Sequence, residues 1–175
     1  MVLRPKRRVS GFPKSGRTAL LLQAVLLTVS CFPGDEHVTS AAEMVAVSRL
    51  MVTFDRLAAA GDADGMANLF TDDAVLMPPN EPAIVGKRLI RKRFEEQFGR
   101  AALALDHEPL EVDASGRFIV HRGRAVGSVR PSGGGPLLKV DDKYLFVLRT
   151  EQDGSLRIWR AIYNSNISTA GDRDH

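Results

Sequence analysis

The spacing of apolar residues predicts a long amphipathic helix between Ser40 and Gly61. Its apolar positions recur at intervals of three and four residues, which places them on one helical face: Met44, Val47, Met51, Phe54 and Ala58. Ser40 and Glu43 have the spacing of a capping box, in which a hydroxyl and a carboxylate satisfy free backbone N–H groups. Gly61 can adopt the left-handed conformation that ends a helix.

The stretch from Gly61 to Pro79, GDADGMANLFTDDAVLMPP, predicts a short helix followed by a short strand. Asp62 or Asp64 can cap this helix, and its apolar face consists of Met66, Leu69 and Phe70. Residues 71–73 are polar and break the helix. Residues 74–77 form an apolar run that two prolines end, because proline cannot donate to a strand ladder.

A third helix is predicted over residues 87–98, closed by Gly99. Its apolar side carries Leu89, Ile90, Phe94 and Phe98, and its other side carries five basic residues. Arg91 and Lys92 stand four residues before Glu95 and Glu96, which is the spacing of local ion pairs. We therefore interpret the basic side as a solvated surface rather than a phosphate site.

Beyond residue 101 the pattern changes from helical to alternating, which is typical of strands. Strands are predicted over residues 103–112, 118–129, 143–149 and 156–167, with a hairpin connection at 131–136. Helices followed by a run of antiparallel strands predict an α+β domain, with three helices packed on one face of a curved, mostly antiparallel sheet.

The first thirty residues differ from the rest of the chain. A basic lead without acidic residues precedes an apolar run of about fifteen residues, too short to span a bilayer. This arrangement is typical of a signal peptide. Cleavage after Ser30 and a lipoprotein signal that ends before Cys31 are both compatible with it, and the second would make Cys31 the lipidated first residue. We expect an exported protein, periplasmic or extracellular, anchored to a membrane only through Cys31.

Charge and cysteine content limit which partners and which covalent links the chain can have. Six of the 24 basic residues and none of the 21 acidic residues precede Cys31, so the remainder carries 18 basic against 21 acidic residues, a net charge of −3. The isoelectric point of about 9.3 therefore reflects the leading segment and does not indicate a nucleic-acid partner. Cys31 is the single cysteine, which excludes an internal disulfide.

The order of helix, GDADGMANLFTDDAVL, loop, helix and strands ending in GSLRIWRAIYNSN resembles the nuclear transport factor 2-like superfamily. Within it, the SnoaL-like and ketosteroid-isomerase-like branch is the most similar, over Ala41 to Ile167. The resemblance implies a cone-shaped fold with an internal pocket and a homodimer formed through the sheet. We accordingly expect a linker at residues 31–38, the domain at 39–168 and a polar tail at 169–175.

The same resemblance allows one activity, ketosteroid isomerisation, to be checked residue by residue. Ketosteroid isomerases use an aspartate base, a tyrosine and a protonated aspartate. Aligned on the shared motif, the base position falls on Pro78 and the tyrosine position on Phe54, neither of which can do this chemistry. The second aspartate corresponds to Asp142 or to its neighbour Asp141. The chain is therefore not a standard ketosteroid isomerase, and whether it is an enzyme stays open.

Other residues are candidates for a pocket. Adjacent strand residues point to opposite faces, so His107 cannot share a face with Asp106 or Glu108. In the last strand, alternation places Trp159, Ala161, Tyr163 and Ser165 on one face. The candidate catalytic residues are Asp142, His107 and Tyr163. The candidate ligand-binding residues are Phe54, Met77, Arg124, Trp159 and Tyr163.

Two function classes follow from these residues. The protein is either an acid–base enzyme of isomerase, lyase or hydrolase type, or a non-catalytic module for ligand binding or dimerisation. In both cases the expected partner is a small apolar or amphipathic molecule. No histidine pair has the helical spacing of a zinc site, and we expect no metal or cofactor. A cluster of ionisable groups inside the pocket would favour the enzyme.

Overall fold

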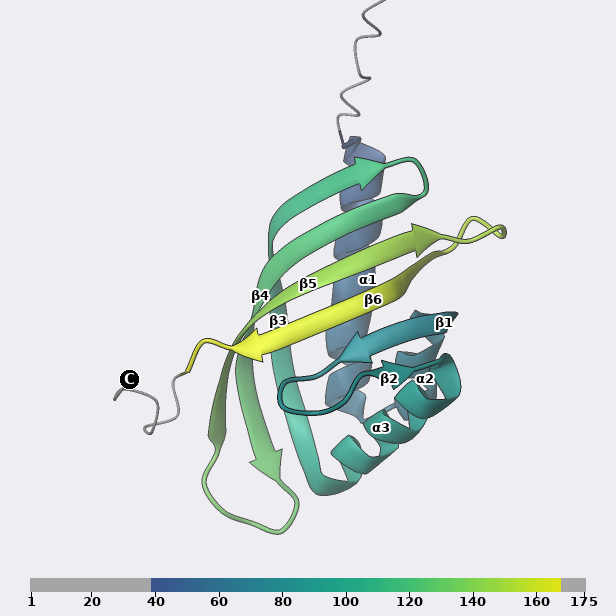
Figure 1. Cartoon of the computed structure of the whole chain (residues 1–175). Helices are drawn as coiled ribbons and strands as arrows, with labels where there is room; N and C mark the ends of the chain where they lie inside the picture. The colour runs from purple at the N-terminus through teal and green to yellow at the C-terminus, as the bar shows by residue number, and fades with distance from the viewer. Residues whose placement is uncertain (1–38, 168–175) are drawn as a thin grey trace, which may run out of the picture. The chain divides into compact units, whose positions relative to one another are not determined.

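The structure, a computed structural model, describes residues 39–167. The predicted signal peptide, Cys31, the linker at 31–38 and the polar tail at 169–175 lie outside the described residues. Three helices pack against a six-stranded mixed sheet that is not closed (Figure 1). This confirms the predicted α+β class and the nuclear transport factor 2-like fold.

The helical half agrees closely with the apolar pattern. Helix α1 (Ala41–Ala60) begins at the predicted capping box and ends at Gly61, whose φ of 66° is left-handed. Helix α2 (Ala63–Asn68) is capped by Asp62, whose side chain accepts from the backbone N–H of Gly65 at 2.8 Å. Helix α3 (Lys87–Arg100) continues two residues beyond its predicted end, through Gly99.

Most strands are longer than alternation alone predicted, but the last one ends at Ser165, two residues before its predicted end. They are β1 (Phe70–Met77), β2 (Ile84–Val85), β3 (Ala101–Ser115), β4 (Phe118–Pro131), β5 (Leu138–Thr150) and β6 (Leu156–Ser165). Phe70 begins β1 rather than ending the short helix, and residues 71–73, predicted to be a break, belong to the strand. Phe70 pairs with Ile158 of β6, so the strand begins before these polar residues, which lie in an irregular stretch of the ladder between Phe70 and Val75.

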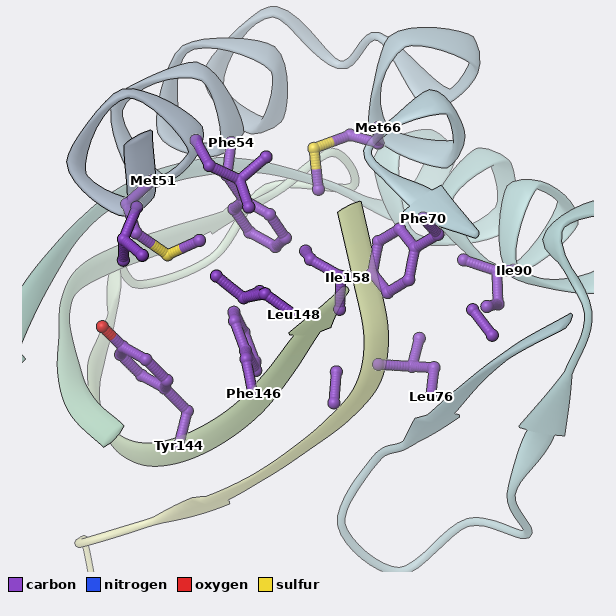
Figure 2. Close-up of a cluster of buried hydrophobic side chains, with 14 of the residues drawn as sticks. Met51, Phe54, Met66, Phe70, Leu76, Ile90, Tyr144, Phe146, Leu148 and Ile158 are labelled. Carbon is purple, nitrogen blue, oxygen red and sulfur yellow. The ribbon is translucent and has the colours of Figure 1, made fainter. Parts of the chain in front are cut away.

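The sheet order is β2-β1-β6-β5-β4-β3, with β1 and β6 parallel and every other pair antiparallel (Figure 1). The core lies between the sheet and the helices. Phe54 of α1 and Met66 of α2 point toward Phe146 of β5 and Ile158 of β6 (Figure 2). Complete burial of one such side chain contributes about 1.5–3 kcal/mol to folding.

A β-bulge in β6 changes which residues face the core. Val147 pairs with Arg160, whereas Leu148 pairs with Ile158, so Trp159 is the extra residue. An extra residue reverses the alternation on one side of the bulge. Ile158 and Ala161 are therefore both buried. The prediction that Trp159 shares a face with Ala161 and Tyr163 is wrong for this reason.

Candidate functional site

A cavity of about 140 Å³ lies between the helices and the inner face of the sheet. Most of its wall is aliphatic or aromatic, which is the usual composition of a small-molecule site. Its polar side chains come from α3 and from three strands: Gln97, His107, Asp142, Tyr144 and Tyr163. The cavity is comparable in size with the engineered protein cavity of about 150 Å³ that binds benzene, so it suits a ring-sized molecule.

Strand register brings His107 and Asp142 into one row. His107 of β3 pairs with Ala125 of β4, and Ala125 pairs with Asp142 of β5, so all three point to the same face. Two strand spacings separate the outer members by roughly 10 Å. Because the middle residue is alanine, space remains between the histidine and the carboxyl group.

His107 is held by a carboxylate from helix α1. Its Nδ1 lies 2.5 Å from Oδ1 of Asp55, and its backbone N–H donates to Oδ2 of the same residue at 3.1 Å. The His107 side chain is 5% exposed and that of Asp55 is 18% exposed. The ring also packs edge-on against Phe54, with centroids 4.9 Å apart. Within residues 39–167 the other ring nitrogen, Nε2, has no hydrogen-bond partner, and His107 is one of the residues that line the cavity.

Burial alters the acidity of two other cavity residues. Desolvation raises the pKa of Asp142 above its ordinary value, against opposing interactions with Ser165 and His107. Desolvation likewise raises the pKa of Tyr163. Both shifts favour the neutral, proton-carrying form, which can donate a hydrogen bond or a proton.

The predicted site residues divide into two groups. Phe54, His107, Asp142 and Tyr163 line the cavity. Asp141, the alternative to Asp142, points to the other face, where its carboxylate accepts two hydrogen bonds of 2.8 Å from Arg124.

Three predicted ligand-binding residues lie away from the cavity. Arg124 has a side chain that is 45% exposed and is paired with Asp141. Trp159, displaced by the bulge, donates through its indole N–H to Asp73 at 3.0 Å and lies under the guanidinium of Arg160. Met77 alternates with Leu76 along β1, and it is Leu76 that lines the cavity. Strand alternation explains why Met77 and Arg124 lie away from the cavity, and the bulge explains why Trp159 does.

Sequence reasoning missed Asp55 and Tyr144. Asp55 stands four residues after Met51 and three before Ala58, so it borders the apolar stripe of α1. An acid at such a position is the pattern that could have identified it. Tyr144 could have been found only with the strand register. Alternation along the strand shows that a side chain points inward, but not whether it belongs to the core or lines a pocket.

Two negative findings concern the described residues only. Between residues 39 and 167 no group of three or more histidine, cysteine, aspartate or glutamate side chains is arranged to hold a metal ion. In the same range no helix is long and apolar enough to cross a membrane.

Several solved structures share this fold. A ketosteroid isomerase-like protein from Erwinia carotovora atroseptica is 22% identical, with a TM-score of 0.67, covering 74% of this chain and 100% of its own. A protein from Novosphingobium aromaticivorans, provisionally named scytalone dehydratase, is 17% identical with a TM-score of 0.67, covering 73% of this chain and 87% of its own. At these identities the likeness shows the fold alone. No curated protein sequence matches the chain.

A family model gives more than the fold. The model of the SnoaL-like domain matches residues 51–161, which is more than half of the chain. The matched segment runs from the middle of α1 to Ala161, two residues after the bulge in β6, and so contains Asp55, His107, Asp142 and Tyr144. The chain therefore belongs to the SnoaL-like domain family.

Proposed function

We propose that this protein is an acid–base enzyme that acts on a small, ring-sized apolar molecule. The observation that carries the proposal is the buried pair of Asp55 and His107, because His107 also lines an apolar cavity. The names of the two neighbours, an isomerase-like protein and a dehydratase, both denote reactions that move protons, which supports the class of chemistry only.

Asp55 prepares His107 to act as a base. With its proton on Nδ1, the neutral ring donates to the Asp55 carboxylate and keeps a lone pair on Nε2. When Nε2 takes a proton from the ligand, the bond's electron pair remains on the ligand. The adjacent carboxylate then stabilises the positive imidazolium, because opposite charges attract strongly in a poorly solvated site.

Asp142 is the partner acid. In its protonated form it faces the ligand from the other end of the row, across the space left by Ala125. It can donate its own proton to a different atom of the ligand, which gives the isomerised or eliminated product, and proton exchange with water then restores neutral His107 and protonated Asp142. The absence of a base at Pro78 and of a hydroxyl at Phe54 distinguishes this arrangement from a standard ketosteroid isomerase.

The experiment uses 5-nitro-1,2-benzisoxazole, a ring-sized probe that reacts with a base alone. When a base removes its C3 proton, the C–H electron pair forms a nitrile and the ring N–O bond breaks. The N–O electron pair stays on the oxygen, which gives a coloured cyanophenolate. We expect His107→Gln to lower kcat/KM by about 10²–10⁴-fold, the usual contribution of a general base. Asp55→Asn should cause a smaller loss. Arg122→Gln, on the opposite face of β4, is the matched control and should leave the rate unchanged.

Two outcomes overturn the proposal. Equal rates for the wild type and His107→Gln would show that this histidine is not the base. Saturable binding of the probe without turnover would favour the alternative, a non-catalytic ligand-binding module.

Export remains a separate proposal that rests on residues 1–30, and mass spectrometry of the native protein tests it by locating the mature N-terminus.

A further inference from the structure

A second buried histidine lies behind the cavity wall. His121 of β4 is fully buried, and its Nε2 lies 3.2 Å from the hydroxyl of Tyr144 on β5. The ring of Tyr144 lies between the two histidines, with centroids 5.1 Å from His121 and 5.0 Å from His107. The proposed base mechanism uses neither His121 nor the Tyr144 hydroxyl.

The surroundings of His121 indicate which group donates. Its Nδ1 is buried without a hydrogen-bond partner among the described residues. A neutral imidazole carries its proton on one nitrogen only. Placing that proton on Nδ1 would leave a buried N–H without an acceptor, and such orphaned N–H groups are rare. The proton therefore belongs on Nε2, from which it is donated to the Tyr144 oxygen. Burial lowers the pKa of His121 to about 4, which keeps the ring neutral.

If Tyr144 accepts from His121, its own O–H proton is left to donate elsewhere. No other partner for this hydroxyl exists within residues 39–167, and Tyr144 lines the cavity. Gly123, directly opposite on β4, makes room for the hydroxyl, because a Cβ there would lie 2.1 Å from the Tyr144 oxygen. Figure 2 shows this oxygen at the far end of the ring, on the side of α1, the helix that supplies Asp55.

The cavity also limits the charge of its ligand. No lysine or arginine is among the described residues that line it. A carboxylate or phosphate group would therefore lose its hydration without gaining a counter-charge, which is costly. A neutral oxygen needs only a hydrogen-bond donor, and Tyr144 supplies one beside the base.

We propose that the Tyr144 hydroxyl, oriented by His121, donates a hydrogen bond to a neutral carbonyl oxygen of a ring-sized ligand. This inference rests on the proposed function, because the same cavity is the site. His107 then faces the acidic C–H next to that carbonyl, and the Tyr144 hydrogen bond stabilises the oxygen as it gains negative charge. Tyr144 is the binding residue, and His121 is a positioning residue that acts through it.

The test is the infrared spectrum of acetophenone labelled with ¹³C at its carbonyl and bound to the full domain. A hydrogen bond lowers the carbonyl stretching frequency, so we expect a downshift in the wild type relative to the probe in an apolar solvent. Tyr144→Phe should remove the downshift while the probe still binds. Arg122→Gln, on the opposite face of β4 and outside the cavity lining, is the control and should retain it.

Substitutions at His121 test its positioning role. His121→Gln keeps a side-chain N–H and should preserve the downshift, whereas His121→Leu should weaken or broaden the band. A thermal melt of each variant verifies folding. The donor assignment is overturned if Tyr144→Phe keeps the downshift, or if the wild type shows none. The positioning role is overturned if His121→Leu gives the wild-type band.

This test is independent of the base. His107→Gln should keep the carbonyl downshift even though it loses turnover of the benzisoxazole. Turnover that depends on His107 without a downshift from Tyr144 would retain the proposed function and reject the donor. A downshift that depends on Tyr144, without turnover, would retain the donor and reject the proposed function.

Discussion

Two buried histidines in this domain have different electrostatic surroundings. The Nδ1 atom of His107 lies 2.5 Å from the carboxylate of Asp55. Among residues 39–167 the His121 side chain hydrogen-bonds only to the neutral hydroxyl of Tyr144, and both desolvation and the nearby His107 lower its pKa to about 4. Burial therefore keeps His121 neutral, whereas His107 has a carboxylate within hydrogen-bond distance.

This contrast predicts how stability depends on pH. An unfolded histidine has a pKa of about 6.5, so between pH 6.5 and 4 the unfolded chain binds a proton that native His121 does not. Stability then falls as the pH is lowered through this window, by about 1–3 kcal/mol from this residue. Urea unfolding of the wild type and His121→Gln at pH 7 and pH 4.5 measures it. The wild type should lose more stability than His121→Gln between pH 7 and pH 4.5, and equal losses would contradict the prediction.

At the residue scale, the sequence predicts which types of side chain line the cavity better than it predicts their pairing. His107, Asp142, Phe54 and Tyr163 were all found from alternation and family resemblance. Asp55 was not, because its partner is 52 positions away along the chain. Only the packing of α1 across β3 brings that carboxylate to the ring, and no local pattern encodes the distance.

At the scale of elements, apolar periodicity located the three helices well and the strand faces less well. Helix ends follow from local groups such as the Ser40–Glu43 box, which act within one turn. Strand ends depend on a neighbouring strand, so β3, β4 and β5 extend beyond their alternating cores. The bulge at Trp159 also depends on the partner strand, and the alternating pattern therefore placed Trp159 on the wrong face.

Two helix glycines provide a matched prediction at this scale. A Cβ on Gly99 of α3 would contact nothing within 4 Å, so Gly99→Ala should stabilise the domain by about 0.5–1 kcal/mol through helix propensity. A Cβ on Gly65 of α2 would lie 2.5 Å from the capping carboxylate of Asp62 and 2.6 Å from Leu57, so Gly65→Ala should destabilise it. Chemical denaturation of both variants measures the two effects, and shifts of the same sign would refute the contact argument.

At the scale of the whole molecule, the sheet face opposite the helices carries an apolar strip. Val120, Leu145 and Ile162 on three adjacent strands are 37–39% exposed, and Leu145 and Ile162 are register partners. The same face carries acids on β3, such as Asp106, and bases on β4 and β5, such as Arg122 and Lys143. A face with both signs of charge can pair with a second copy across a twofold axis.

We therefore expect a homodimer formed through this face. Leu145→Glu places a charge in the strip and should shift the protein to monomer, while the circular dichroism spectrum stays unchanged. Leu137→Glu, in the exposed β4–β5 connection, is the control and should remain dimeric. Analytical ultracentrifugation at micromolar concentration measures the mass. A monomeric wild type would rule out the dimer.

The parallel pairing of β1 with β6 has a consequence for synthesis. Phe70 lies beside Ile158, so the two strands cannot pair until 88 further residues have left the ribosome. Until then the inner face of β1 and much of the cavity wall stay uncovered, and exposed apolar surface of this kind favours aggregation. Pairing across so long a separation also slows folding, because the chain must close a large loop before the contact stabilises it. The last strand to be made is thus the one that completes the core, and a chain that stops before β6 lacks the strand on which β1 depends.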